Sequence, residues 1–396
     1  MDEKARAWLE VIRDQVTPEE YDLLARAQAT LLANVADPND ATEAPCGGRP
    51  ASEAGKPLPW HPRRGIHPSR YGYRGIWNWD SAFHAIAVAR WDPELAREQF
   101  EIMLGLQQPD GSLPDVLMEN GNLVTSFGKP PVMPWAVARA DELHPDADFL
   151  ADAYDRFIAY EQHWMRDRGG AADGLFHYGG GEPNLESGWD NAVRWDQGCD
   201  NLWTVDLNCF MVMLYEAMAY MAKQLDILED RVLWRGRAME LGDRINDTLW
   251  DDRIGAYADR NRETGEFSDV LSPASFMPLY VKIAVKERGA KLAKLAANPR
   301  KIHPGMPTVN YDHPQYDSRD FWRGPMWLNV AYFALKGLRE CGHRDVAEEI
   351  RRTILGWCRH ESEYLFEYYD SRDGTGLGAK QFSWTATFVI EFILDW

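Results

Sequence analysis

Apolar residues recur every three or four positions along most of the 396-residue chain, which is the period of an amphipathic helix. Between 18 and 34, for example, Tyr21, Leu24 and Leu32 share one helical face, and Thr17-Pro18-Glu19-Glu20 before them has the form of a capping box. The same pattern predicts helices over residues 2–14, 18–34, 81–91, 93–106, 132–143, 147–166, 205–226, 230–249, 273–285, 288–296, 327–341, 344–358 and 382–394.

Several of these helices are apolar on more than one side, as in the run Cys209-Phe210-Met211-Val212-Met213-Leu214. A helix of this kind is buried among other helices. Strand-like alternation is limited to residues 253–259 and 364–369, which excludes a doubly wound sheet. We therefore predict an all-α protein whose paired helices close into a barrel. Because no linker rich in Pro, Gly or Ser divides the chain, we expect residues 1–396 to form a single domain.

Residues 35–75 interrupt the helical pattern with a long segment rich in Pro, Gly and polar residues, and we expect a functional loop or lid there. Residues 56–79, here called the cationic arm, contain no acidic residue. They do contain arginines at positions 63, 64, 70 and 74. Two interpretations stay open. The arginines bind an anionic leaving group of a substrate, or they tie the loop to the acidic body of the protein.

The composition of the chain indicates which classes of binding partner are disfavoured. The formal net charge of -19 disfavours nucleic acid, and no apolar stretch is long enough for a membrane span. The N-terminal MDEKARAWLE does not have the form of a secretory signal. Five widely spaced cysteines without a CxxC pair favour reduced thiols in a cytoplasmic protein. We expect a small carbohydrate substrate, a possible homo-oligomer, no nucleic acid, no membrane, no cofactor and no metal.

The most unusual stretch is 186–196, in which Glu186, Asp190 and Asp196 accompany Trp189 and Trp195. Indole rings suit the C–H faces of a sugar. A carboxyl group beside them in a poorly hydrated pocket has a raised pKa and can donate a proton. The alternative is a surface loop whose tryptophans fill the core and whose acids are solvated. The 17 Trp of the chain are typical of carbohydrate-active proteins.

Further motifs lie before and after this stretch, in a fixed order across residues 70–394. The order of these motifs resembles that of the inverting α-glycosidases of glycoside hydrolase family 63 and the related trehalases. The chain is similar to the compact bacterial subgroup that hydrolyses mannosylglycerate and glucosylglycerate. The resemblance implies an (α/α)6 barrel. It is carried by Trp77-Asn78-Trp79-Asp80, Gly188-Trp189-Asp190, Val205-Asp206-Leu207-Asn208, Trp322-Arg323-Gly324-Pro325-Met326-Trp327, Glu367-Tyr368-Tyr369-Asp370 and Gln381-Phe382-Ser383-Trp384-Thr385.

The resemblance implies that Asp190 is the general acid and Glu367 the general base. Lys129 marks a departure, because Gly128-Lys129-Pro130-Pro131 stands where many members have Ser-Gln-Pro-Pro. This difference bears on the substrate more than on the reaction. The predicted substrate-binding residues are Tyr73, Trp77, Trp79, Asp80, Lys129, Trp189, Arg194, Trp322, Arg323, Gly324, Trp327 and Trp384.

The predicted function is an inverting, exo-acting α-glycoside hydrolase that releases glucose or mannose from a small α-glycoside such as glucosylglycerate or mannosylglycerate. Inversion requires two carboxyl groups separated by about 6.5–9.5 Å, so that a water fits behind the anomeric carbon. Three alternatives stay open: an α-glucosidase for a neutral disaccharide of the trehalose or isomaltose type, a sugar epimerase or isomerase, and a non-catalytic carbohydrate-binding barrel. The motifs contain no histidine, which argues against the epimerase.

Overall fold

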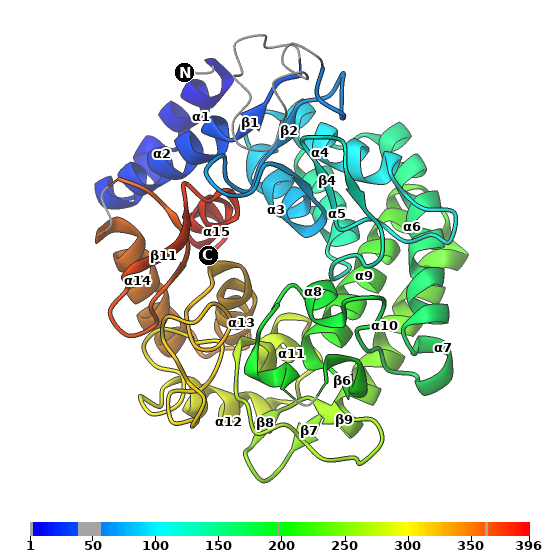
Figure 1. The fold of residues 1–396 in the computed structure, drawn as a ribbon, viewed down its shortest axis with the longest axis vertical. Helices are drawn as coiled ribbons and strands as arrows, with labels where there is room; N and C mark the ends of the chain where they lie inside the picture. Colours follow the sequence, from blue (N-terminus) through cyan, green and yellow to red (C-terminus); the bar gives the residue numbers. More distant parts are fainter. Residues whose placement is uncertain (1–2, 39–56, 197, 361–362) are drawn as a thin grey trace.

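The computed structural model describes residues 3–38, 57–196, 198–360 and 363–396. Its helices form a ring in which α2, near the start of the chain, lies beside α15 at its end (Figure 1). The helices are α1 (Glu3–Ile12), α2 (Pro18–Ala33), α3 (Asn78–Val88), α4 (Pro93–Gly105), α5 (Met133–Leu143), α6 (Ala147–Asp167), α7 (Gly170–Asp173), α8 (Pro183–Ser187), α9 (Val205–Gln224), α10 (Leu228–Thr248), α11 (Met277–Tyr280), α12 (Lys286–Ala296), α13 (Leu328–Glu340), α14 (Arg344–His360) and α15 (Ser383–Leu394).

Six helices make a closed inner ring. Going round it, α3 contacts α5, then α9, α11, α13 and α15 follow, and α15 contacts α3 again. Each inner helix has an outer partner: α4 on α3, α6 on α5, α10 on α9, α14 on α13 and α2 on α15. The sixth inner helix, α11, has α12 as its outer neighbour, because Leu279 of α11 approaches Gly289 of α12. The predicted all-α fold and the (α/α)6 barrel are confirmed.

The inner and outer helices differ in sequence as their positions require. On the inner α9, all residues of the run 209–214 are buried, as predicted for a helix surrounded by others. The outer α14 buries one stripe only, formed by Ala347, Ile350, Ile354, Leu355 and Cys358. No helix in the described ranges combines the length and the apolar character needed to cross a membrane.

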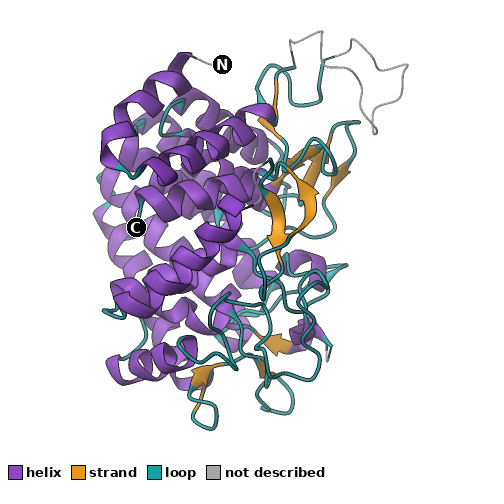
Figure 2. Cartoon of the chain, turned by 90° about the vertical axis from the view of Figure 1, so that its left-hand side faces the viewer, coloured by secondary structure: helices purple, strands orange, loops and turns teal. Residues whose placement is uncertain are grey.

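The strands and long loops gather at one end of the barrel (Figure 2). Two of these groups matter for the site: the antiparallel sheet β3-β4-β5 and the hairpin β10-β11. The strands are β1 (Val35–Ala36), β2 (Gly65–Ile66), β3 (Gly75–Trp77), β4 (Val116–Met118), β5 (Leu123–Val124), β6 (Leu202–Trp203), β7 (Trp250–Asp251), β8 (Ala256–Tyr257), β9 (Arg260–Asn261), β10 (Phe366–Tyr369) and β11 (Gly376–Lys380).

Two sequence predictions need correction. The helix predicted over 273–285 ends at Tyr280, because Lys282 adopts a left-handed backbone conformation with φ 60°. The predicted loop 35–75 is partly ordered as β1 paired with β2, which places Val35 opposite Ile66. Residues 39–56 of that loop, including Lys56 of the cationic arm, lie outside the described residues.

Candidate active site

A small pocket, with a cavity volume of about 80 Å³, is formed by segments from distant parts of the chain. This volume lies below the usual range for ligand pockets, so the cavity is too small for a chain of sugar rings. Aromatic rings make up most of its wall, and three carboxyl groups face it. The lining residues are Pro68, Tyr73, Trp77, Trp79, Asp80, Lys129, Gly188, Asp190, Phe321, Trp322, Trp327, Glu367, Phe382 and Trp384.

Two larger hollows lie against the outer helices and are less suited to chemistry. One is lined by residues of α4, α5 and α6, and the other by residues of α4 and α6. Their charged groups already pair with one another, as Arg97 does with Asp146 (Nη1 to Oδ2, 3.1 Å) and Arg63 with Glu101 (2.7 Å). The aromatic pocket is therefore the candidate active site.

Asp190 reaches the pocket from the turn that follows the short helix α8. Gly188 ends that helix with φ 74°, a conformation that favours glycine, and a Cβ atom there would lie 2.5 Å from the Trp79 ring. The Ser187 hydroxyl accepts a hydrogen bond from the Trp189 amide at 3.0 Å. The turn is thus fixed closely against the opposite wall, and Asp190 is only partly exposed.

Glu367 lies on β10 at an irregularity in its pairing with β11. Its Oε2 accepts a hydrogen bond from the Ala379 amide of β11 at 2.9 Å. Gly378 has φ 73°, and a Cβ atom there would lie 2.5 Å from the same Oε2. The hairpin therefore positions the carboxyl group from behind, and a side chain at residue 378 would displace it.

The motif at residues 77–80 forms the junction between β3 and α3, as its sequence predicted in outline. Trp77 ends the strand and Asp80 lies in the first turn of the helix. The Asn78 side chain donates to the carbonyl of Pro114 at 2.9 Å, which ties the junction to the segment before β4. Trp79 and Asp80 are 2% and 3% exposed, so both face the pocket in a poorly hydrated setting.

A stack of four rings supports one wall. Trp322 and Trp327 are parallel with centroids 3.8 Å apart, Tyr368 covers Trp327 at 4.5 Å, and Trp189 covers the other side of Trp322 at 5.1 Å. Such stacking holds large rings in fixed orientations. Trp384 meets Trp327 edge-on at 5.5 Å and so extends the wall.

The pocket raises the pKa of its acids. Burial raises the pKa of Asp80 to about 8 and that of Glu367 to about 7, and it also raises the pKa of Asp190. The charge of Asp190 raises the pKa of Glu367 further, whereas the Ala379 amide and the Tyr73 hydroxyl lower it. Near neutral pH the pocket therefore offers both a proton donor and a proton acceptor.

Lys129 places a positive charge among these acids. Its Nζ pairs with Oδ1 of Asp115 at 3.1 Å and donates to the carbonyl of Leu185. The charge lowers the pKa of Asp80 and of Asp190, which limits the effect of burial. Lys129 thus lines the pocket, as predicted, and its nearest charged partner is an acid of the protein.

Four of the predicted binding residues do not line the pocket. Trp189 is fully buried behind Trp322, and Gly324 is engaged with Thr308 and Ser371. The other two, Arg194 and Arg323, form ion pairs with acids of the protein. In this structure these four residues support the wall of the pocket and are not among its lining residues. A motif brings lining and supporting residues into one short stretch, and its sequence does not separate the two kinds.

Arg194 is the centre of a buried ionic network. It binds both oxygens of Asp259, at 2.7 and 2.9 Å, and Oδ1 of Asp206 at 2.8 Å. Its guanidinium lies 4.7 Å from the centre of the Trp189 ring. This network lies directly behind the turn of Asp190.

Arg323 links the two loops that carry Asp190 and Trp322. It makes a bidentate pair with Asp196, at 2.8 and 2.9 Å, and donates to the carbonyl of Asn191 at 3.1 Å. The Asn191 side chain in turn accepts a hydrogen bond from the Trp322 amide at 2.9 Å. The loop that carries Asp190 and the loop that carries Trp322 are therefore linked by direct hydrogen bonds.

The cationic arm is paired with the body of the protein. Arg63 binds Glu101 at 2.7 Å, Arg64 binds Glu98 at 2.7 Å and Asp92 at 3.0 Å, and Arg74 makes a bidentate pair with Glu119. Arg70 donates to the carbonyl of Val35 at 2.5 Å. These contacts favour the interpretation that the arginines tie the loop to the body over the interpretation that they bind an anionic leaving group.

Sequence reasoning missed five residues at the site. Phe382 stood inside a quoted motif and Phe321 directly precedes another, and their apolar character beside tryptophans was an available signal. Gly188 belonged to a motif as well, and its signal was the sharp turn that glycine permits. Pro68 and Asp115 lay outside any motif, and only the structure shows that Pro68 lines the pocket and that Asp115 pairs with Lys129.

The chain is similar to known glycoside hydrolases in sequence and in fold. The family model described as the mannosylglycerate hydrolase MGH1-like glycoside hydrolase domain matches residues 73–385. The mannosylglycerate hydrolase of Rubrobacter radiotolerans is 25% identical over 410 residues, which cover 82% of this chain and 91% of that protein. The crystal structure of the GH63 mannosylglycerate hydrolase from Thermus thermophilus with Tris and D-glycerate superposes with a TM-score of 0.77, at 21% identity, over 93% of this chain and 99% of that one. The neutral trehalase Nth1 from Saccharomyces cerevisiae superposes with a TM-score of 0.66, at 19% identity, over 80% and 71%.

Fold, pocket and likeness together define a glycoside hydrolase built on an (α/α)6 barrel. The family model spans well over half of the chain and includes the segments that carry Asp190 and Glu367. The chain belongs to the family of MGH1-like glycoside hydrolase domains, and the resemblance inferred from its motifs is confirmed.

Proposed function

We propose that the protein is an inverting, exo-acting α-glycosidase that hydrolyses a small α-glycoside of glycerate to glycerate and glucose or mannose. The observation that carries the proposal is the pocket itself, in which Asp190 and Glu367 approach one small aromatic cavity from separate loops. The glycerate follows from the relatives, because proteins named mannosylglycerate hydrolase match over four fifths of this chain.

In the proposed reaction Asp190 donates a proton to the glycosidic oxygen as the bond to the anomeric carbon breaks. Glu367 accepts a proton from a water that attacks the same carbon from the opposite face. The sugar leaves as the β-anomer, and the aglycone leaves as an alcohol. The raised pKa of Asp190 suits the donor, and a Glu367 pKa of about 7 places the acceptor near neutral pH.

The remaining lining residues bind the terminal sugar. Trp77, Trp79 and Trp384 supply ring faces and edges, and Tyr73 lies within reach of Glu367. Asp80, with a pKa of about 8, is protonated at neutral pH and offers a hydrogen-bond donor to a sugar hydroxyl. Because the wall closes around one ring, cleavage proceeds from a chain end.

A second substrate class has an observation in its favour. The arginines of the cationic arm pair with the body, and Lys129 pairs with Asp115, so these groups already have anionic partners. A neutral disaccharide of the kind that trehalases cleave therefore stays a candidate. The reaction and the residues would be the same, and only the aglycone would differ.

The two substrate classes are separated by kcat/KM. The native enzyme is assayed on glucosylglycerate, mannosylglycerate, the neutral glucosylglycerol and trehalose, with the released monosaccharide identified. We expect a preference of tenfold or more for a charged glycoside over glucosylglycerol. Equal rates, or a preference for the neutral sugars, would contradict the glycerate proposal and support the second class.

Asp190→Asn tests whether the release of sugar belongs to this pocket. The variant is expected to lose the activity, whereas Asp200→Asn, an exposed aspartate ten residues along the chain, is expected to keep it. Activity that survives in Asp190→Asn would remove the proposed acid.

We also propose that residues 1–396 form one domain of a cytoplasmic enzyme. Contact between α2 and α15 joins the two ends of the chain in one ring, and Cys199, Cys209, Cys341 and Cys358 are free thiols. A homo-oligomer stays a prediction, which light scattering during gel filtration would test.

A further inference from the structure

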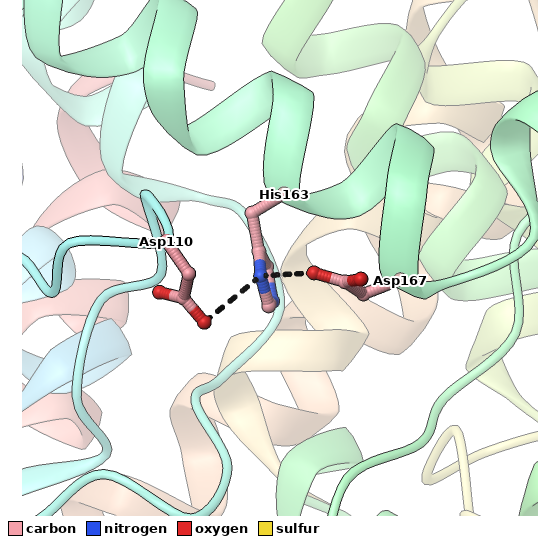
Figure 3. Close-up of side chains that lie close together, drawn as sticks. All are labelled: Asp110, His163 and Asp167. Carbon is pink, nitrogen blue, oxygen red and sulfur yellow. Dashed lines mark ion pairs between the residues drawn. The ribbon is translucent and has the colours of Figure 1, made fainter.

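A cluster of three side chains lies apart from the active site. His163 and Asp167 are one turn apart on α6, and Asp110 approaches them from the loop between α4 and β4 (Figure 3). The Nδ1 atom of His163 lies 3.0 Å from Oδ2 of Asp167 and 3.7 Å from Oδ2 of Asp110. One donor atom from each residue falls within 4.8 Å of the others.

His163 carries the argument. The residue is 8% exposed, and its Nδ1 is shielded from solvent without a hydrogen-bond partner of acceptable geometry. Figure 3 shows this nitrogen directed between the two carboxylates. A buried polar atom of this kind normally has a partner, and leaving it without one destabilises the folded protein. A cation between the three residues would supply the missing partner.

We propose that Asp110, His163 and Asp167 bind a divalent metal ion, and that the ion is zinc. Ligand atoms that surround zinc as a tetrahedron at about 2.0–2.2 Å lie about 3.3–3.6 Å from one another. The separations from the imidazole nitrogen, 3.0 and 3.7 Å, fall on either side of that range. All three ligand atoms lie within 4.8 Å of one another, so rotation of the side chains would complete the site. Water fills the position that remains.

The donor set selects the metal. An imidazole nitrogen suits zinc and disfavours calcium and magnesium, which prefer oxygen ligands alone. Oδ1 of Asp110 already accepts hydrogen bonds from Ser112, so its Oδ2 is the oxygen available to the ion.

Arg166 is a competitor for the same acids. Its Nη2 donates to Oδ2 of Asp167 at 2.6 Å and to the carbonyl of Asp110 at 3.1 Å. Zinc bound to Oδ2 would displace the first of these contacts, and the Nε contact with Oδ1 of Asp167, at 3.1 Å, would remain. Removal of Arg166 is therefore expected to strengthen metal binding, an effect that a purely structural cluster would not show.

The ion would fasten two segments that lead to the active site. The loop of Asp110 continues to Asp115, the partner of Lys129, and Asp167 precedes Arg168, which binds Glu186 at 2.7 Å. A second link between loop and helix already exists, since Gln107 donates to the carbonyl of Arg156 at 2.8 Å. The role assigned to the metal is to stabilise this corner of the barrel, and it does not depend on the proposed substrate.

The test is zinc binding by titration calorimetry, together with thermal unfolding of the metal-free protein with zinc, calcium or magnesium. We expect one zinc per chain. At a hundredfold excess of zinc over its Kd, we expect the melting temperature to rise by about 3 °C. Calcium and magnesium are expected to cause no rise.

Variants assign the ion to the cluster. Asp110→Asn, at an exposed position that should not disturb folding, and His163→Gln are each expected to weaken binding at least tenfold. Arg166→Ala is expected to strengthen it severalfold. His144→Gln, an exposed histidine beyond the cluster, is the control and should bind as the native protein does. Absence of a zinc-dependent rise in the melting temperature of the native protein would overturn the proposal. So would zinc binding by Asp110→Asn and His163→Gln that is as tight as that of the native protein.

Discussion

Replacement of Glu367 by Gln should remove the activity and yet stabilise the protein above neutral pH. Burial raises the pKa of Glu367 from an ordinary 4.5 to about 7 in the folded protein. Between these values the folded state holds a proton that the unfolded chain has lost. Since the folded state binds more protons there, the free energy of unfolding falls as the pH rises from about 4.5 to 7.

The size of this effect follows from the same two pKa values. The ionised carboxylate costs roughly 3 kcal/mol of stability at pH 8. At pH 4.5 it costs less than about 0.5 kcal/mol, because the group is protonated in the folded state and half protonated in the unfolded chain. Gln carries no charge at either pH, so Glu367→Gln is expected to gain about 3 kcal/mol at pH 8. For a chain of 396 residues this corresponds to a rise of about 3–4 °C in melting temperature.

Thermal unfolding at pH 4.5 and pH 8 tests the reasoning. Glu363→Gln, an exposed glutamate just before β10, is the matched control and should change little at either pH. In parallel, kcat of Glu367→Gln should fall by about 10²–10⁴-fold, as expected for loss of a general base. A variant that is less stable than the native protein at pH 8, or equally stabilised at both pH values, would refute the assigned pKa.

Three other changes are expected to act through different contacts. Asp190→Asn should lower kcat by about 10²–10⁴-fold without lowering the melting temperature, whereas Asp200→Asn should leave both unchanged. Arg194→Met leaves two buried carboxylates unpaired and should cost about 3–5 kcal/mol in urea unfolding; a cost below about 1 kcal/mol would contradict the buried network. Gly378→Ala adds a Cβ atom 2.5 Å from the Glu367 carboxyl group, at a residue with φ 73°. It should lower kcat at least tenfold and the free energy of unfolding by about 1–3 kcal/mol. A native kcat would contradict the claim that the hairpin positions Glu367.

Much of the fold could be predicted because burial leaves a periodic trace in the sequence. Helices such as α9 and α14 show either apolar residues all round or a single stripe, and both patterns identify their place in the barrel. The end of the helix predicted over 273–285 could not be located in this way. The helix stops before Lys282, which has a left-handed backbone conformation. A lysine side chain does not indicate that conformation in the sequence.

Residues of the active site could be predicted where a sequence motif marks a turn. They were harder to predict where the role of a charged residue depends on the ion pair that it forms. Trp77, Asp80 and Glu367 lie at the pocket as expected. Arg323 is an arginine in a sugar-site motif, but its partner is Asp196, which lies 127 residues away in the chain. A sequence shows that a charge exists and leaves open which opposite charge the fold brings to it.

The partners of the cationic arm could not be predicted from the sequence for the same reason. Its arginines are local and conspicuous in the sequence, whereas the acids that bind them are spread over 92, 98, 101 and 119. Only the folded chain shows that these acids face the arm. The His163 cluster is the converse case, because an i, i+4 pair on α6 gains its third member, Asp110, from a separate loop.

The central claim is inverting hydrolysis of a glycerate glycoside, and the anomer of the fresh product tests it most directly. Proton NMR is recorded during the first minutes after the native enzyme is mixed with α-glucosylglycerate and, separately, with α-mannosylglycerate. The account predicts that the β-anomer of the sugar and free glycerate appear together in equal amounts from at least one of the two, and that the α-anomer grows in later by mutarotation. Appearance of the α-anomer first would contradict inversion, and absence of free glycerate from both compounds would contradict the substrate.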